Sequence, residues 1–332
     1  MNDFKTSFAE ILIAHETLIR RTPIEPPCSF GTMSTILITG GSGLIGSALT
    51  KALQQDGHGV RWLSRMAGER NGVKAFAWDV DKGTLDAAAL QGVDHIIHLA
   101  GAGIADKRWT DARKKELERS RAESARLLLR TAKAQGFAPR SFISSAGINY
   151  YGAVTGEHVF TENDAPGTDH IAHLSKVWEQ AVDEWAPVCR VVMLRTPLVL
   201  AHDGGGLKKL AMPVRFGLGA PLGSGKQWMP WVHLDDLVRI YQHALTNEAM
   251  RGAYNVNASE QPTNRDFTKA VAKALGRPLF LPPVPGFLLN IALGELSSIL
   301  LGGSRASNAK LLGTGFTFRY DALDAALKDC LK

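Results

Sequence analysis

A glycine-rich segment between an aliphatic run and a helical pattern has the spacing of a phosphate-binding turn. Glycines occupy positions 40, 41, 43 and 46, directly after the run 36–38, and helix-forming residues follow to about position 55. Glycine lets the backbone turn tightly and approach a pyrophosphate, while the first turn of a helix offers free N–H groups. This order predicts a dinucleotide site, with an ordinary glycine-rich turn as the alternative. The expected contacts are Gly40, Gly43, Leu44, Ile45 and Gly46.

The end of the next predicted strand, at 59–64, indicates which dinucleotide would bind. Proteins that use NAD usually have an acidic residue there, which binds the ribose 2′-hydroxyl. This sequence has Ser64 and Arg65 instead, and a guanidinium can pair with a 2′-phosphate that a carboxylate would repel. The two residues therefore favour NADP(H) over NAD(H); the alternative is that Arg65 is a solvated loop residue.

Two further segments are expected beside the same cofactor, each directly after a predicted strand, at 73–78 and at 95–98. Small residues after a strand allow the backbone to lie close to a flat ligand. His95 and His98 face opposite sides of their strand, so we interpret both as structural. The expected cofactor contacts are Asp79, Leu99, Ala100 and Gly101.

Four hydroxyl side chains follow one another where a further strand is predicted to end. Ser144 and Ser145 end the run 141–145, and Tyr150 and Tyr151 come shortly after it. The carboxyl ends of parallel strands border the ligand crevice of such a sheet. These hydroxyls are candidates for positioning or protonating a substrate, and an ordinary polar loop is an equally good interpretation.

The segment 223–231 combines glycines, a cation, an amide and two indoles. This mixture is typical of a pocket rim that adapts to a ligand, and a packing loop between domains is the alternative. A histidine and two aspartates follow, where a helix is expected to begin. The expected substrate contacts are Tyr150, Gln227, Trp228 and His233.

Metal and nucleic-acid binding are not expected. His170 and His173 lie beside Asp169, but no third ligand can be placed there. The basic run at 105–135, which contains Arg113 and Arg121, is interrupted by glutamates and lacks interleaved aromatic residues, so it predicts a solvated helix face. RNA binding through that helix is the weakest hypothesis.

Composition indicates a soluble cytoplasmic protein. The chain has 332 residues with 45% hydrophobic and 21% charged residues, a net charge of +6 and three widely spaced cysteines. The apolar segment 287–301 is short and contains Asn290 and Glu295, which predicts a buried helix rather than a membrane span. Residues 1–32 lack a basic start followed by an apolar core, so we expect an extension outside the fold, with a docking arm as the alternative.

The order of predicted elements is that of an α/β protein with a Rossmann-type doubly wound parallel sheet. We expect the dinucleotide-binding domain to comprise 33–200 with 232–258, because a strand at 253–257 should return to the sheet. A smaller C-terminal substrate domain would comprise 201–231 with 259–332. The ligand crevice would lie between the two, and the oligomeric state is left open.

Several motifs in this sequence resemble those of extended short-chain dehydrogenase/reductases. The segments that carry this likeness are Thr39–Gly46, His98–Gly101, Phe142–Ala146 and Tyr150–Gly152. A closer likeness is to the atypical YfcH-like NAD(P)-dependent epimerase family, and it covers about 33–332. That likeness rests on Ile104–Trp109, Gly223–His233 and Gly315–Tyr320.

The resemblance implies a Rossmann fold, NADP preference and catalysis by a Ser or Thr with a Tyr-x-x-x-Lys pair. Lys176 matches the lysine, which would bind the nicotinamide ribose, but Ala172 stands where the tyrosine is expected. The acid would then come from elsewhere, with Tyr151 or Tyr150 as substitute and Ser145 orienting a carbonyl. We therefore expect an NADP(H)-dependent oxidoreductase or epimerase for a small, sugar-like molecule. An NADP(H)-binding sensor or scaffold without turnover is the alternative.

Overall fold

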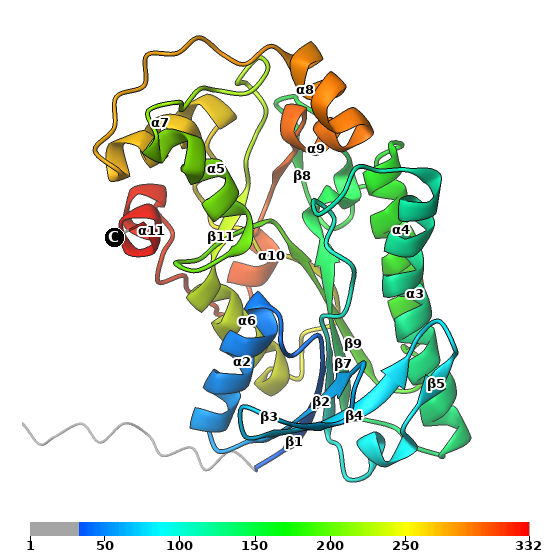
Figure 1. Cartoon of the computed structure of the whole chain (residues 1–332). Helices are drawn as coiled ribbons and strands as arrows, with labels where there is room; N and C mark the ends of the chain where they lie inside the picture. Colours follow the sequence, from blue (N-terminus) through cyan, green and yellow to red (C-terminus); the bar gives the residue numbers. More distant parts are fainter. Residues whose placement is uncertain (1–32, 332) are drawn as a thin grey trace, which may run out of the picture. The chain divides into compact units, whose positions relative to one another are not determined.

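Aliphatic and β-branched runs form a central sheet, which the computed structural model describes within residues 33–331 (Figure 1). In this part of the chain the main sheet has nine strands, in the order β12-β9-β7-β6-β1-β2-β4-β3 with β5 beside β4. All pairs are parallel except those made by β3 and β5. The strands are β1 (Thr35–Thr39), β2 (Gly59–Ser64), β3 (Gly68–Arg70), β4 (Val73–Asp79), β5 (Thr84–Leu85), β6 (His95–His98), β7 (Ser141–Gly147), β9 (Arg190–Thr196) and β12 (Gly252–Asn255).

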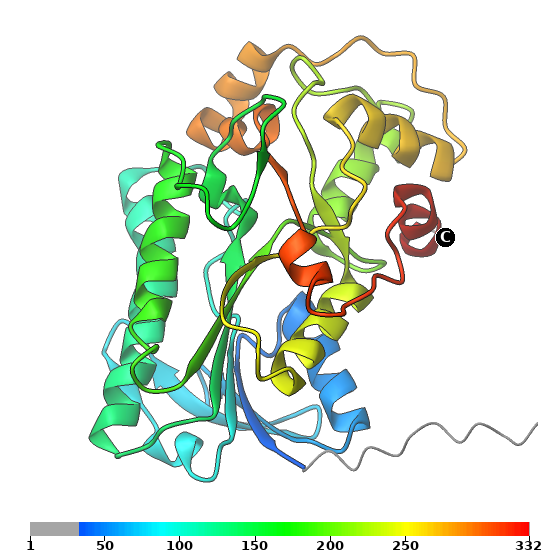
Figure 2. The same cartoon turned by 180° about the vertical axis from the view of Figure 1, so that it is seen from behind.

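Helices cover both faces of this sheet (Figures 1 and 2). The pair α2 (Leu44–Gln55) and α6 (Leu234–Thr246) packs on one face, where Ile36 and Ile38 enter the core. The pair α3 (Asp111–Ala134) and α4 (His170–Asp183) packs on the other, where Leu37 enters a second core. Strands buried on both faces explain the continuous apolar runs. The predicted α/β class with a Rossmann-type doubly wound parallel sheet is confirmed.

The order in which successive strands are added to the sheet reverses beside β1. That strand lies between β2 and β6, so the segments after β1 and β6 leave the sheet toward opposite faces. Ligands of open α/β sheets bind at such a point, outside the carboxyl ends of the strands. The glycine turn that follows Thr39 therefore lies where a cofactor is expected. The predicted extension at 1–32 falls outside the described residues.

The remaining elements form a third apolar core. The chain leaves the main sheet after β9, where Pro197 follows, and β10 (Leu198–Leu200) pairs with β11 (Trp231–His233) outside that sheet. The core of this region includes Leu207, Phe267 and Leu327. Its helices are α5 (Gly205–Arg215), α7 (Asn264–Ala274) and α11 (Leu323–Cys330). The residues from Ser34 onward form one compact unit, and the two-domain boundaries stay a prediction.

Short elements complete the chain. The strands β8 (Val159–Phe160) and β13 (Arg305–Ala306) pair with each other, away from the main sheet. The rest are η1 (Ala87–Leu90), η2 (Ile148–Tyr151) and α10 (Ala309–Leu312).

The apolar segment predicted as one buried helix is neither continuous nor buried along its first half. It forms α8 (Gly286–Leu293), η3 (Gly294–Ser297) and α9 (Ser298–Leu301). The break falls at Gly294, which has a φ of 61°. No residue of α8 is buried, and Phe287 and Ile291 are 62% and 70% exposed. The prediction of a buried helix is therefore wrong. None of the helices within the described residues is long and apolar enough to span a membrane.

A buried carboxylate ties the C-terminal segment to α6. Asp236 is fully buried and accepts hydrogen bonds from the backbone N–H groups of Arg319 (2.8 Å) and Tyr320 (2.7 Å). It also accepts one from the Arg239 guanidinium at 2.6 Å. The carboxylate therefore holds the chain before α11 against the first turn of α6.

Candidate functional site

The glycines after β1 are required by close backbone contacts. Gly40 has a φ of 71°, and a Cβ there would lie 3.0 Å from the carbonyl carbon of Leu99. A Cβ on Gly46 would lie 2.3 Å from the carbonyl oxygen of Gly40, which no side chain could tolerate. A Cβ on Gly41 would likewise clash with the indole of Trp62. The turn is therefore held tightly between β6 and α2.

The first turn of α2 can hold an anion. Its N-cap is Gly43, which has no side chain, so no side-chain cap hydrogen bond is made to the N–H groups of the first turn. Backbone N–H groups and the helix dipole together attract negative charge. The predicted contacts Leu44, Ile45 and Gly46 begin this helix, so the geometry suits the pyrophosphate of a dinucleotide.

Beside this turn, Thr39 and His98 connect the ends of β1 and β6. The Thr39 hydroxyl oxygen accepts hydrogen bonds from the N–H groups of Leu99 (3.1 Å) and Ala100 (3.0 Å). Its proton therefore goes to His98 Nδ1 at 2.9 Å. His98 Nε2 then carries the proton and donates to the Ser124 hydroxyl at 3.1 Å. The histidine is structural, as predicted, and fixes the backbone that leads to Gly101.

The residues expected at the 2′-phosphate lie at the end of β2, next to the glycine turn in the sheet. Ser64 is half-buried and Arg65 is exposed. Among the described residues, none forms a hydrogen bond or ion pair with the Arg65 guanidinium. Asp79, at the end of β4, accepts from the N–H groups of Asp81 and Lys82 and so stabilises its own turn. Those hydrogen bonds, the one from Lys82 first, lower its pKa.

Two arginines that sequence analysis placed on a solvated helix face are buried. Arg113 and Arg121 are 7% and 5% exposed. They donate to the carbonyls of Gly103 (2.5 Å) and Ala102 (2.8 Å), in the segment after β6. The prediction of a fully solvated face is therefore wrong, because these two cations are needed to hold that segment. No spacing signal distinguishes them from the exposed arginines of the same helix.

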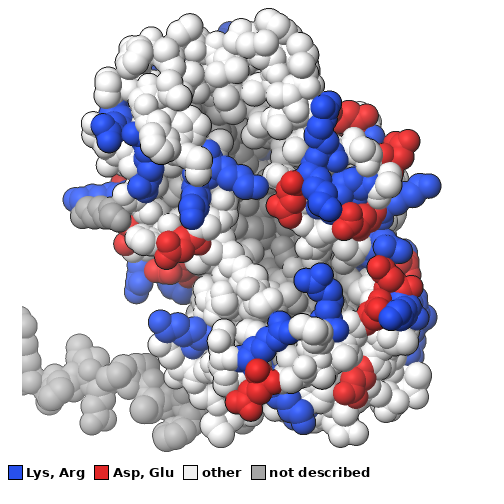
Figure 3. Space-filling model, in the orientation of Figure 1, with Lys and Arg blue, Asp and Glu red and all other residues white. Residues whose placement is uncertain are grey.

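The surface is hollowed beside this segment. Figure 3 shows the hollow between the side of α2 and α5 and the side of α3 and α4, with lysine and arginine side chains along both margins and some acidic side chains among them. Basic side chains at the edge of a cleft attract anionic ligands. The hollow is therefore compatible with an anionic cofactor that starts from the glycine turn.

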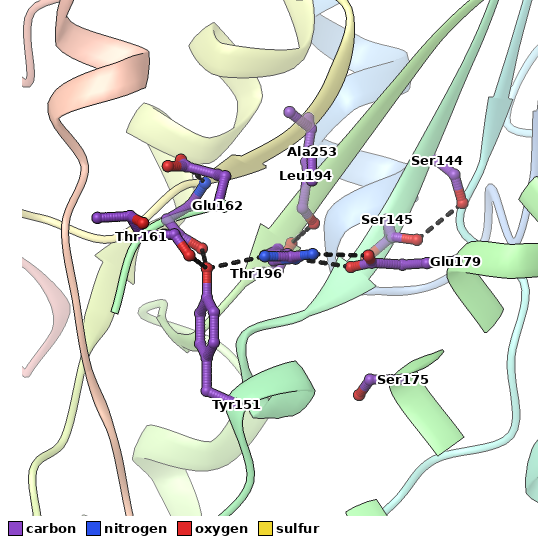
Figure 4. A network of polar contacts seen from close by, with 12 residues as sticks. Ser144, Ser145, Tyr151, Thr161, Glu162, Ser175, Glu179, Leu194, Thr196 and Ala253 are labelled. Carbon is purple, nitrogen blue, oxygen red and sulfur yellow. Dashed lines mark hydrogen bonds and ion pairs between the residues drawn. The ribbon is translucent and has the colours of Figure 1, made fainter. Parts of the chain in front are cut away.

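Tyr151 belongs to a buried polar network (Figure 4). Its side chain is 1% exposed, and its hydroxyl lies within hydrogen-bond distance of the Thr161 carbonyl (2.9 Å) and the Asn255 amide oxygen (2.8 Å). It accepts a hydrogen bond from Arg195 at 2.8 Å, and Arg195 also forms a bidentate ion pair with Glu179. Burial raises the pKa of Tyr151 to about 12. The network joins η2, α4, β9 and β12.

Tyr150 has a different environment. Its half-buried ring stacks on the guanidinium of Arg195, whose central carbon lies 3.6 Å from the ring centroid. Within the described part of the chain, its hydroxyl has no hydrogen-bond partner. This phenol is therefore free to bond a ligand, whereas that of Tyr151 is already engaged.

The structure separates the other catalytic candidates. Ser145 follows Ile143 on the sheet face covered by α6, near Tyr241. Lys176 is exposed on α4, which packs on the opposite face. Ala172, four residues before that lysine, is fully buried. Ser145 and Lys176 therefore belong to opposite faces of the sheet, and the catalytic roles of Ser145, Tyr151 and Lys176 stay predictions.

Two of the expected substrate contacts, Gln227 and Trp228, are engaged in hydrogen bonds within the protein. Gln227 is 1% exposed, and its amide donates to the carbonyls of Leu222 and Leu300. Trp228 donates from its indole to the carbonyl of Gly156 at 2.8 Å. These bonds hold loops together, so any contact of either residue with a substrate stays a prediction.

His233 caps a helix and is the centre of a small cluster. Its Nδ1 accepts from the N–H of Asp235, and its buried Nε2 lies 3.2 Å from the Asp329 carboxylate without hydrogen-bond geometry. Ligand atoms of His233, Asp329 and Cys330 lie within 4.8 Å of one another. A metal would need an unprotonated Nε2 and a thiolate, yet burial raises the pKa of Cys330 to about 12. The geometry fits a capping hydrogen bond better than a metal centre.

A glycine turn at the point where the strand order of a parallel sheet reverses defines a Rossmann-type dinucleotide-binding protein. Residues 36–257 match the family model described as the NAD dependent epimerase/dehydratase family. Residues 284–330 match a domain of unknown function, DUF1731. The chain belongs to the NAD dependent epimerase/dehydratase family.

Similar proteins extend over almost the whole chain. The mouse (Mus musculus) epimerase family protein SDR39U1 is 34% identical over 300 residues, which cover 89% of this chain and 98% of that protein. The crystal structure of human SDR39U1 (isoform 2) with NADPH has a TM-score of 0.80 and 32% identity, and covers 89% of this chain and 98% of the human one. A nucleoside-diphosphate sugar epimerase from Corynebacterium glutamicum has a TM-score of 0.73 and 30% identity, and covers 90% and 58% of the two chains.

Proposed function

We propose that this protein is an NADP(H)-dependent oxidoreductase or epimerase that acts on a small molecule. The observation that carries the proposal is the unpaired guanidinium of Arg65 at the end of β2, beside the glycine turn. An arginine there complements a 2′-phosphate. The NADPH in the similar human structure supports this choice of cofactor. The free thiols of Cys189 and Cys330 support a cytoplasmic location.

The residues present fit such a cofactor. The N–H groups of Leu44 and Ile45 would hold the pyrophosphate, and Ser64 and Arg65 would hold the 2′-phosphate. The segment 99–101, fixed by Thr39, would border the nicotinamide half. A nicotinamide supplies a hydride donor or acceptor when bound. The protein's own task is then to orient the substrate and move a proton.

Tyr150 is the better candidate for the proton donor. Its hydroxyl is free, and the positive charge of Arg195 lies against its ring. Tyr151 supports that arrangement from behind through its own hydrogen bond to Arg195. Lys176 is exposed and long enough to move toward a bound ribose, which needs only its charge and reach. In this scheme Tyr150 replaces the tyrosine missing at Ala172.

A second candidate function is an NADP(H)-binding sensor or scaffold without turnover. The observation that favours it is the fully buried methyl group of Ala172, which has no titratable group. Turnover assays separate the two functions. Oxidation of NADPH by a panel of aldehydes and ketones, lost in Tyr150→Phe, supports the enzyme. Unchanged cofactor in every assay supports the sensor.

Calorimetric titration with NADPH and NADH tests cofactor choice. We expect NADPH to bind at least tenfold tighter, because Arg65 pairs with the 2′-phosphate; tenfold is about 1.4 kcal/mol. The Arg65→Ala variant should lose this preference while NADH affinity changes little. The control is Arg277→Ala, which removes the same charge from an exposed arginine after α7. Equal affinity for both cofactors, or a preference that survives in Arg65→Ala, would contradict the proposal.

A further inference from the structure

An apolar pocket lies outside the cofactor site, between α5, α7 and the segment from α8 to α9. Its volume is about 350 Å³, the size of a small-molecule site. Its walls include Leu210, Val214, Phe267, Val271, Leu289 and Leu300. Neither the glycine turn nor the Tyr151 network contributes to it. A cavity of this kind is expected to bind something apolar.

The chemistry of the walls excludes a diphosphate. Among the described residues that line the pocket, Lys209 is the only charged side chain. Asn264 already accepts from the N–H of Leu222 at 2.7 Å, and the Thr268 hydroxyl donates to the carbonyl of Asn264 at 2.7 Å. These polar groups are engaged within the protein. A nucleoside diphosphate would need several cations or free N–H donors, which these walls do not offer.

One end of the pocket is directed toward the cofactor. Helix α5 begins beside α2, because a Cβ on Gly205 would lie 3.1 Å from the Leu44 side chain. One turn further on, Lys209 donates to the carbonyl of Ala105, in the segment after β6, at 3.4 Å, and its ammonium lies 3.9 Å from the exposed Asp106 carboxylate, which a ligand's acidic group would replace. Lys209 and Ala105 both line the pocket. This end therefore lies between α5 and the segment that borders the cofactor site.

One face of the exposed helix α8 covers this pocket. Leu289 and Leu293 are four residues apart, so they lie on one helix face, and both line the pocket. The carbonyl of Leu300, in α9, is fixed by the buried amide of Gln227 at 2.7 Å. Leu289 and Leu300 therefore face the pocket, while Leu293, Leu296 and Ile299 both line it and pack in a small core.

We propose that this pocket binds the hydrocarbon chain of the substrate, with the polar end of the ligand at Lys209. The chain is of medium length, and its polar end leaves the pocket toward the cofactor site. This inference rests on the proposed function in one respect only, namely that the bound molecule is the substrate of the reaction. Binding of the chain itself needs no cofactor, so the two can fail separately.

Calorimetric titration with a series of fatty acids tests the chain. Hexanoate, octanoate and decanoate are added to the full chain, with and without NADPH, below micelle-forming concentrations. Each added methylene should tighten binding by about threefold to fourfold, the factor for burying one CH₂ group. Uridine diphosphate is the comparison ligand, and it should not compete with decanoate. Binding of uridine diphosphate with no effect of fatty-acid length would overturn the proposal.

Two neighbouring leucines of α8 provide a matched pair of variants. Leu289→Arg places a charge in the pocket wall and should weaken decanoate binding at least tenfold. Leu288→Arg makes the same change at a 47% exposed residue that does not line the pocket, and binding should stay within threefold. Lys209→Ala should weaken decanoate but not decanol. Equal losses in both arginine variants would refute the pocket assignment.

NADPH affinity of each variant, measured in parallel, shows whether the fold and the cofactor site are intact. Decanoate binding without any NADPH binding would leave the pocket in place and refute the proposed cofactor. NADPH binding without decanoate binding would leave the cofactor in place and refute the apolar substrate.

Discussion

Tyr150 and Tyr151 are adjacent, yet their hydroxyl groups have opposite environments. That of Tyr151 is engaged by Thr161, Asn255 and Arg195, while that of Tyr150 has no partner among the described residues. Sequence analysis could place both at the end of β7 but could not separate them. The network depends on residues up to 104 positions apart, which no local pattern reveals.

Phenylalanine substitutions distinguish the two tyrosines. Tyr151→Phe should lower the free energy of unfolding by about 1–3 kcal/mol, because buried donors and acceptors lose their partner. Tyr150→Phe should change it by less than about 0.5 kcal/mol, since its hydroxyl bonds nothing in the described chain. Urea unfolding followed by tryptophan fluorescence measures both. Equal destabilisation by the two substitutions would contradict the assignment.

His98 is held neutral by its surroundings. Burial lowers its pKa from 6.5 to about 4. Thr39 donates to Nδ1, so protonation there would put two protons against each other. Since the unfolded chain titrates near 6.5, it binds more protons than the folded chain between pH 6.5 and 4.

We therefore expect the free energy of unfolding to fall as the pH decreases from 6.5 to 4. His98 contributes a loss on the order of 3 kcal/mol, complete near pH 4 and absent above pH 6.5. Buried His95, whose pKa burial also lowers to about 4, acts in the same direction. Urea unfolding at pH 7.5, 6 and 5 measures this slope, which should be flatter in His98→Gln. The exposed His202→Gln is the control and should keep the wild-type slope.

At the level of elements, the glycine turn could be predicted because its signals are local. The spacing of glycines between a strand and a helix indicates a tight turn wherever it occurs. The fate of 286–301 could not be predicted, because hydrophobicity indicates an apolar neighbour without saying which one. In the structure one face of α8 lines a pocket, and Leu296 packs in a small core. The burial of Arg113 and Arg121 likewise depends on the path of another segment.

Gly46→Ala tests the tightness of the turn. Its methyl group would lie 2.3 Å from the Gly40 carbonyl oxygen, so the turn must open. We expect a loss of about 1–3 kcal/mol in the free energy of unfolding and at least tenfold weaker NADPH binding. Gly156→Ala is the control, because a Cβ there has no atom within 4 Å among the described residues. Thermal unfolding and calorimetry measure both, and a silent Gly46→Ala would show that the turn is looser than described.

On the scale of the whole molecule, Asp236 links distant parts of the sequence. Its buried carboxylate accepts from Arg319, Tyr320 and Arg239, so Asp236→Asn replaces one acceptor with a donor against a backbone N–H. We expect a loss of about 1–3 kcal/mol. Asp235→Asn, at the neighbouring exposed carboxylate, is the control and should cost less. Urea unfolding gives both values, and an Asp236→Asn variant as stable as the wild type would show that this link is weak.

The link made by Asp236 limits where the polypeptide can be divided into parts that are expressed separately. The two family models match residues 36–257 and 284–330, and this division suggests two separable modules. Yet Asp236 lies in the first and its backbone partners in the second, and Phe316 packs in the same core as Ile36. Leu323 and Leu327 likewise share a core with Leu207 and Trp231. Expression of either module alone would expose these surfaces, so boundaries drawn by sequence families are not places to divide this polypeptide.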